Sequence, residues 1–279
     1  MAFPGKVVVA TDASVEAALA ARMAAGLSAA SGSELHLLTV DQEEPETVLS
    51  EASREVEGVG GEVTQTHSRD LSTGRIDGEI VAAAEDLGAD LIVVGSRGRG
   101  ALKRALIGSV SDSVVRHAHC SVLVVRDGQD QPPLPETVLV AVDGSEESRE
   151  AADKAMEVAS VVGAGLHLVY GVPTIPSSVY PGSTVVEGTE TVSEHLRDQA
   201  RAVLTREEER LGSRGGDVAD THLVMGKADE RIIGTAEDLD AGLLVIGSRG
   251  LGGVRRSLLG SVSASVVRHA YCPVMVVRK

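Results

Sequence analysis

The chain has 279 residues and a formal net charge of −15, and 43% of its residues are hydrophobic. This length fits two domains of ordinary size better than one, and the negative charge repels nucleic acid and acidic membrane surfaces at long range. With one Phe, three Tyr and no Trp, the chain also lacks aromatic platforms for base stacking, so we expect neither a nucleic acid nor a membrane partner.

The first half alternates strand and helix signals along the chain. Short β-branched or alternating runs predict strands at 6–10, 35–40, 62–67, 91–94 and 121–126, and apolar periodicity predicts helices at 15–30, 48–59 and 75–87. This order predicts an α/β fold, a doubly wound parallel sheet with helices on both faces. Such sheets bind ligands beyond the carboxyl ends of their strands, where Asp12, Val40 and Gly95 stand.

A proline-containing spacer at 127–136 leads into a second half with the same plan. We therefore assign one domain to 1–126, a linker to 127–136 and a second domain to 137–279. Strands are predicted at 137–142 and 166–172, with a helix at 146–162 between them. Residues 173–195 lengthen the second half and lack a helical period, so we interpret them as a loop. A lid, a partner surface and a plain surface loop remain open for it.

One stretch occurs in both halves, at 92–118 and 244–270. Each copy runs from an apolar strand into Gly, two residues, Gly, nine residues and then Gly-Ser. The early glycines predict a backbone with positive φ that comes close to a ligand, because no Cβ stands in the way. The later Gly-Ser, Gly108-Ser109 and Gly260-Ser261, places a hydroxyl and backbone N–H groups at a helix start, which favours a bound anion. The stretch is typical of a phosphate site.

Together with Asp12 and Asp143, these motifs resemble the universal stress protein family, in its tandem two-domain, ATP-binding form. That family carries the pattern GxxGx9G followed by Ser or Thr, and both copies match it without a gap. The resemblance covers nearly the whole chain. It implies a Rossmann-like fold of the adenine-nucleotide α-hydrolase type, and ATP as the ligand, with Mg²⁺ bound through the phosphates.

The resemblance also implies roles for individual residues. The two aspartates would contact the nucleoside, and the backbone at Val40 and Gly171 would read adenine, although the family usually has a bulkier aliphatic residue at the second position. The expected nucleotide-binding residues are Asp12, Val40, Gly95, Arg97, Gly98, Arg99, Gly108, Ser109, Val110, Asp143, Gly171, Gly247, Arg249, Gly250, Gly260, Ser261 and Val262. Basic residues of the two loops, including Arg255 and Arg256, supply local positive charge.

Competing sites can be tested against the same residues. Gly226-Lys227 lacks the earlier glycine of a Walker A loop, and the third glycine of a dinucleotide fingerprint falls on Lys103 or Arg255. No GxSxG elbow is present, so Ser109 and Ser261 are interpreted as phosphate ligands and helix caps rather than nucleophiles.

The remaining candidates favour ordinary structural roles. The cluster of His117, His119 and Cys120 loses one donor in the second half, so we expect no metal site formed by protein side chains alone. Cys120 and Cys272 are expected to be buried apolar side chains. The first residues lack the pattern of a signal peptide and no apolar run is long enough to span a bilayer, so we expect a cytoplasmic protein.

Two functions follow from these observations. The favoured one is a nucleotide-responsive stress protein that binds ATP in both halves without fast catalysis. The alternative is a slow adenine-nucleotide hydrolase, in which Arg97 and Arg99 would clamp the transferred phosphoryl group. Each half ends in a β-forming strand, and the open edge of such a strand seeks a partner. The resemblance implies that the two halves pair these strands within one chain, and we expect whole chains to form a homodimer through other surfaces.

Overall fold

The computed structural model describes residues 3–72, 74–98, 107–126, 134–173, 188–251 and 259–278. The first half contains β1 (Lys6–Ala10), α1 (Val15–Ser31), β2 (Glu34–Val40), α2 (Pro45–Gly58), β3 (Gln65–Arg69), α3 (Ile76–Leu87), β4 (Leu91–Gly95), α4 (Ser109–His117) and β5 (Ser121–Val125). The second contains β6 (Thr137–Ala141), α5 (Glu146–Val162), β7 (Gly165–Val172), α6 (Gly188–Gly212), β8 (Val218–Met225), α7 (Ala228–Asp238), β9 (Leu243–Gly247), α8 (Ser261–His269) and β10 (Val274–Val277).

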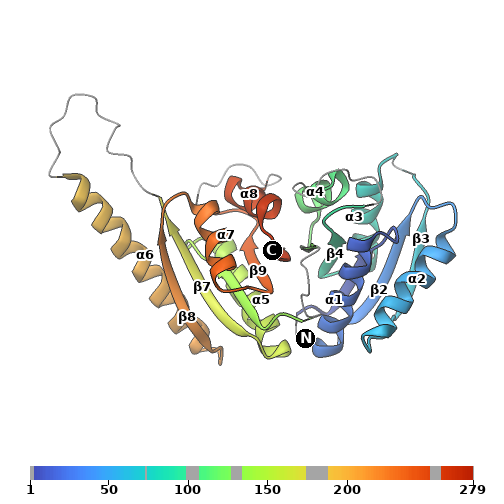
Figure 1. Cartoon of the computed structure of the whole chain (residues 1–279), viewed down its shortest axis with the longest axis horizontal. Helices are drawn as coiled ribbons and strands as arrows, with labels where there is room; N and C mark the ends of the chain where they lie inside the picture. The colour runs from blue at the N-terminus through green and yellow to red at the C-terminus, as the bar shows by residue number, and fades with distance from the viewer. Residues whose placement is uncertain are drawn as a thin grey trace.

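These strands form one ten-stranded sheet in the order β3-β2-β1-β4-β5-β10-β9-β6-β7-β8 (Figure 1). Within each half every described pairing is parallel, which confirms the predicted doubly wound α/β fold. The chain leaves β1 toward β2 and later returns on the other side of β1 to form β4. The crevice between the ends of β1 and β4 is therefore the point where strand order reverses.

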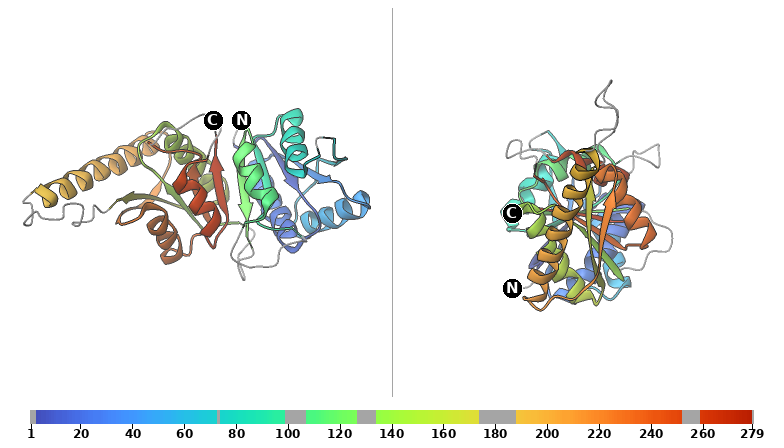
Figure 2. Two further views of the ribbon diagram at one scale, coloured as in Figure 1. Left: turned by 90° about the horizontal axis from the view of Figure 1, so that it is seen from above. Right: turned by 90° about the vertical axis from the view of Figure 1, so that its left-hand side faces the viewer.

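Helices cover both faces of the sheet (Figure 2). The buried side chains of α1, α2, α5 and α6 belong to the core on one face, and those of α3, α4, α7 and α8 to the core on the other. Along β1, Val7 and Val9 enter the first core and Val8 the second. A fully buried parallel strand has two apolar faces, which explains why its sequence is an unbroken apolar run.

Local signals set the limits of the first helix of each half. Ser14 caps α1 by accepting a hydrogen bond from the Ala17 amide, and Gly32 ends it with a φ of 72°. Ser145 and Gly163 do the same for α5. A serine at the N-cap satisfies an otherwise unpaired amide, and glycine adopts the left-handed conformation at low cost.

The two halves meet edge to edge. β5 and β10 pair antiparallel, with Leu123 opposite Met275, and this confirms the predicted pairing of the last strands within one chain. The arginine that follows each strand crosses to the other half. Arg126 donates to the Val267 carbonyl of α8, and Arg278 donates to the Val115 carbonyl of α4 at 2.7 Å. Each cation thus lies at the negative C-terminal end of the partner half's helix.

Three predicted elements are corrected. Helix α2 begins at Pro45 rather than at 48, because proline's fixed φ suits the first helical position. Strand β3 covers 65–69 rather than 62–67. Residues 188–195, interpreted as loop, belong to α6, whose N-terminal end extends past the sheet in Figure 1. Residues 188–195 lack an apolar period, so their pattern carried no helical signal. Residues 174–187 of the same segment lie outside the described residues.

Among the helices in the described ranges, none combines the length and the apolar character needed to cross a bilayer.

Candidate functional site

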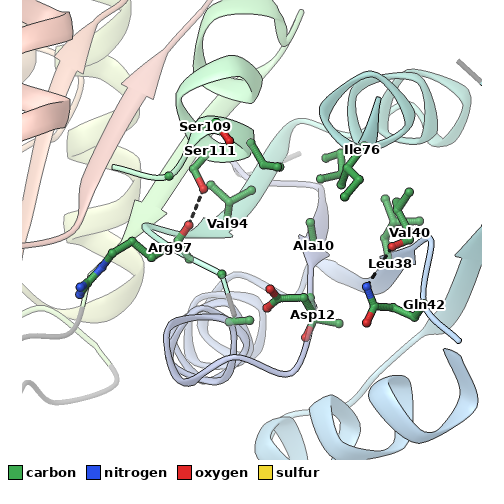
Figure 3. Close-up of a pocket in the computed structure, with 17 residues that line it drawn as sticks. Ala10, Asp12, Leu38, Val40, Gln42, Ile76, Val94, Arg97, Ser109 and Ser111 are labelled. Carbon is green, nitrogen blue, oxygen red and sulfur yellow. Dashed lines mark hydrogen bonds between the residues drawn. The ribbon is translucent and has the colours of Figure 1, made fainter. Parts of the chain in front are cut away.

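A cavity of about 480 Å³ opens at the carboxyl ends of β1, β2 and β4 in the first half (Figure 3). It lies at the point where strand order reverses, as the sequence predicted. Loops after β1 and β4 form one side, and α3 and the start of α4 form the other. Its lining residues are Ala10, Thr11, Asp12, Ala17, Leu38, Val40, Gln42, Ile76, Ile80, Val94, Gly95, Arg97, Gly98, Gly108, Ser109, Val110 and Ser111.

Asp12 lies where the loops after β1 and β4 meet. One carboxylate oxygen, Oδ1, accepts a hydrogen bond from the Ser14 amide at 3.0 Å. A Cβ on Gly98 would collide with the other oxygen, Oδ2. The absence of a side chain at Gly98 therefore lets the two loops touch. This brings together a carboxylate and a glycine that are 86 positions apart in the numbering of the chain.

Helix α4 points its N-terminus into the same cavity. Gly108 is its N-cap residue, and its amide donates to the Ser96 carbonyl at 2.7 Å. The Ser111 hydroxyl donates to the Gly95 carbonyl at 2.7 Å, so the helix start is tied to the end of β4 (Figure 3). The first amides of a helix have no partner within the helix and carry the positive end of its dipole. The cavity thus has an anion-attracting end.

The structure corrects the expected role of Ser109 and Ser261. Each is the first residue inside its helix, α4 or α8, whereas the preceding glycine takes the N-cap position with extended backbone angles. Neither helix has a side-chain cap hydrogen bond. Both serines are exposed at the helix start, and neither hydroxyl caps its helix.

The early glycines also act differently from the prediction. Gly95, Gly98, Gly247 and Gly250 do not have positive φ. Each is instead required by a close neighbour. A Cβ on Gly95 would lie 2.7 Å from the carbonyl carbon of Glu16 in α1, and one on Gly247 would lie 2.8 Å from a carbonyl oxygen in α5. Glycine is needed here for close packing of a helix against a strand end.

Two of the three arginines predicted to contact phosphate, Arg97 and Arg249, are engaged by carboxylates. Arg97 Nη2 lies 2.7 Å from Glu16 Oε1, and both side chains are largely buried. Arg249 Nη2 lies 3.0 Å from Glu147 Oε1 in the second half. Figure 3 shows the guanidinium of Arg97 directed away from Asp12 and Ser109. The structure therefore brings the backbone of Arg97 to the cavity and holds its charge outside.

The second half repeats the polar framework. Asp143 Oδ1 accepts from the Ser145 amide at 2.9 Å, and Oδ2 accepts from the Leu251 amide at 3.0 Å. The Gly260 amide donates to Ser248 at 2.8 Å. The Ser263 hydroxyl donates to Gly247 at 2.8 Å. The strand end, the aspartate loop and the helix N-terminus are thus arranged as in the first half, and Val262 lies in the first turn of α8.

Gly171 differs from its counterpart Val40. Val40 is buried and lines the first cavity, and its carbonyl accepts a hydrogen bond from Gln42 Nε2 at 3.2 Å. A Cβ on Gly171 would lie 3.0 Å from Cα of Ala228, the first residue of α7. The end of β7 is therefore in direct contact with a helix.

Sequence reasoning missed part of the lining. Ile76 and Ile80 come from the first turns of α3, and Gln42 follows the end of β2. The isoleucines lie four positions apart, so they share one face of the helix. That spacing is visible in the sequence, where it predicted only the helix at 75–87. Ile80 in fact serves both, since it packs in the core and lines the cavity.

Some predicted residues cannot be placed. Arg99, Arg255 and Arg256 lie outside the described residues. The proposed metal candidates near α4 have other partners or surroundings. His117 Nδ1 lies 2.8 Å from the Ser113 carbonyl, and Cys120 is buried. Burial raises the pKa of the Cys120 thiol to about 11, and that of Cys272 to about 12. Both cysteines therefore remain protonated near neutral pH.

Comparison with known proteins gives concordant results. The sequence profile of the universal stress protein family matches residues 4–126 and 135–278. A universal stress protein of Mycobacterium tuberculosis is 36% identical over 195 residues, which are 68% of this chain and 62% of that protein. One of Mycolicibacterium smegmatis is 35% identical over 243 residues, 85% of this chain and 75% of that protein. The match thus spans less than two thirds of the length of the first of these relatives.

Solved structures agree on the fold. A universal stress protein from Archaeoglobus fulgidus aligns with a TM-score of 0.71 at 24% identity, covering 99% of each chain. A similar protein from Pseudomonas aeruginosa aligns with a TM-score of 0.73 at 23% identity, covering 98% of this chain and 93% of that one. At such identities the likeness concerns the arrangement of helices and strands.

Proposed function

The chain belongs to the universal stress protein family, and we propose that it acts within this family as a nucleotide-responsive stress regulator. In this proposal the chain binds ATP with Mg²⁺, and the occupancy of the nucleotide site, rather than fast turnover, carries the signal to a partner or to the chain's own assembly. One observation carries the proposal: a single cavity in the first half joins an apolar end to an anion-attracting end.

The apolar end suits a purine. Leu38, Val40, Ile76 and Ile80 line it, and the volume of about 480 Å³ falls within the range of roughly 300–1,000 Å³ usual for small-molecule pockets. Specificity for adenine would come from backbone groups at the end of β2. Because the Val40 carbonyl now accepts from the Gln42 side chain, that amide must share the carbonyl or swing away when a base binds.

The other end suits a triphosphate. The first amides of α4, the exposed Ser109 hydroxyl and the backbone at Gly98 face one space in which no Cβ intrudes. Mg²⁺ prefers oxygen ligands and keeps several waters, so phosphate oxygens with few protein ligands are sufficient for it. The Asp12 carboxylate lies between the two ends, at the place where it can accept hydrogen bonds from ribose hydroxyls.

The same geometry favours binding over hydrolysis. Amides at a helix start stabilise ground-state phosphates as well as a transition state, and such uniform binding does not accelerate chemistry. The Arg97 charge, which a hydrolase would use as a clamp, is paired with Glu16. We expect fewer than about one turnover per second, below the ~1–10³ per second typical of enzymes. Turnover in that range, lost in Arg97→Ala, would favour the hydrolase instead.

We also propose that whole chains form a homodimer through surfaces other than the paired β5 and β10 strands. Light scattering on the purified chain checks this, since a mass of one chain at all concentrations would refute it.

Isothermal titration with Mg·ATP tests the binding proposal. Gly98→Ala places a methyl group against the Asp12 carboxylate, so binding in the first half should weaken at least tenfold. Gly58→Ala is the matched control, because nothing lies within 4 Å of the added Cβ at the end of α2. Absence of ATP binding by the unaltered chain, or equal binding by Gly98→Ala, would overturn the proposal.

A further inference from the structure

We propose that the two halves are not equivalent: the first seats the purine of a nucleotide, whereas the second accepts a polyphosphate group but excludes the base. This inference rests on the proposed function and deepens it, since it assigns a different ligand class to each half. It is carried by a contact between β7 and α7 that closes the place where the first half has its apolar cavity.

Two pairs of equivalent positions define the difference. Val40 is the last residue of β2 and Gly171 the next-to-last residue of β7, and Ile76 and Ala228 begin the helix that follows the third strand of their halves. In the first half the two large side chains border the cavity, and Ile76 remains about one third exposed. The side chains hold the start of α3 away from the strand end, and the space between them is open.

In the second half both side chains are smaller, and the end of β7 lies directly against the start of α7. A Cβ built on Gly171 would lie 3.0 Å from Ala228 Cα, 3.1 Å from its Cβ and 3.5 Å from its carbonyl oxygen. Cα and the carbonyl oxygen belong to the helix backbone and Cβ is fixed to it, so none of these atoms can turn aside as the end of a long side chain can. The strand end and the helix start are thus already in van der Waals contact.

Further bonds hold α7 in this position. The Gly226 amide donates to the Val172 carbonyl at 2.9 Å, which ties the residue before the N-cap to the end of β7. Arg231 Nε donates to the Met225 carbonyl at 2.7 Å, from the first turn of α7 back to the end of β8. Seating a purine there requires breaking this set of contacts.

The phosphate end of the second half does not share this closure. Gly250 allows the loop after β9 to touch Asp143, and Gly260 begins α8 with the same backbone angles as its counterpart in α4. The anion-attracting helix start is therefore retained in the half where the end of β7 lies against α7. A ligand with phosphates and no base, such as inorganic tripolyphosphate, can bind at this helix start and needs no space between β7 and α7.

Binding stoichiometry separates the alternatives in the full chain. Native mass spectrometry and titration with Mg·ATP should give one nucleotide per chain, and magnesium tripolyphosphate should give two equivalents. Two ATP molecules bound with affinities within threefold of one another would overturn the inference and leave the proposed function intact. Absence of any ATP binding would overturn the proposed function and this inference with it. A single tripolyphosphate equivalent would refute the polyphosphate site of the second half.

The location of the base needs a separate readout. Photolabelling with 8-azido-ATP, followed by peptide mapping, should mark residues near Val40 or Ile76 in the first half. Label in peptides of the second half in comparable yield would contradict the inference. This experiment uses the unaltered chain, so it does not depend on whether a variant folds.

A variant that copies the second half into the first tests the cause. Val40→Gly combined with Ile76→Ala should lose ATP binding at least tenfold, while tripolyphosphate still binds with two equivalents. Val59→Ala is the control for removal of a partly exposed apolar side chain away from the cavity. Unchanged ATP affinity in the double variant would show that these two side chains do not determine the difference.

Discussion

The contact between the end of β4 and helix α1 predicts a measurable cost for one methyl group. In Gly95→Ala the added Cβ would lie 2.7 Å from the Glu16 carbonyl carbon and 2.9 Å from the Ala17 nitrogen. Both are helix backbone atoms, so strand and helix must separate by several tenths of an ångström. Overpacking of this kind typically costs about 1–3 kcal/mol. Alanine also restricts the unfolded chain more than glycine does, and this stabilises the folded state by about 0.4–1 kcal/mol. We therefore expect a net loss of about 1–2 kcal/mol in the free energy of unfolding.

Gly234→Ala provides the matched comparison. Gly234 lies inside α7, where nothing is within 4 Å of an added Cβ, so the same substitution should stabilise the chain by about 0.5–1 kcal/mol. Urea unfolding followed by circular dichroism should give opposite shifts of the midpoint for the two variants. If Gly95→Ala unfolds at the same urea concentration as Gly234→Ala or at a higher one, the packing role assigned to the motif glycine is wrong.

Three further predictions concern other parts of the chain. Arg278→Met removes charge-assisted hydrogen bonds to α4 and should lower the free energy of unfolding by about 1.5–3 kcal/mol, so an unchanged urea midpoint would refute the role assigned to the crossing arginine. Burial, followed by the neighbouring histidine, lowers the pKa of His67 and of His167. The stability that these two neutral imidazoles contribute should therefore be present above about pH 6.5 and should fall as pH drops through their folded-state pKa values. Replacing both histidines by Gln should reduce the loss of melting temperature between pH 7.5 and 5, and an equal loss in the variant would contradict this. Because burial raises the pKa of Cys120 and Cys272 to about 11 and 12, iodoacetamide at pH 8 should label them only after unfolding, and full labelling of the native chain would show them accessible.

The fold was predictable because its signals are local and repeated. Unbroken apolar runs such as Val7–Val9 indicate strands buried on both faces, and the repeat of the whole pattern indicates two halves. The pairing of β5 with β10 was predicted from two β-forming strands that each needed a partner, together with the family resemblance. The positions of Asp12, Val40 and Gly95 at strand ends were likewise sufficient to bring them to one crevice.

Other features depend on contacts that a linear pattern does not contain. The motif glycines were expected to need positive φ, whereas Gly95 is required by the backbone of α1. Arg97 carries a charge that suits phosphate, but its partner Glu16 lies in a helix far away in sequence. Glu207 lies in the charged run 206–210, a pattern that by itself favours a solvated helix face, yet its side chain is buried between Arg149 and Arg210. In each case tertiary packing decides the role.

A crystal structure of the full chain grown with Mg·ATP is the decisive measurement. We expect it to show the purine in the first half between Val40 and Ile76, the ribose beside Asp12, and the phosphates against Gly98 and the N-terminus of α4. A nucleotide bound with its phosphates away from that helix start would contradict it. So would one bound only in the separate cavity of about 350 Å³ that lies beside α5.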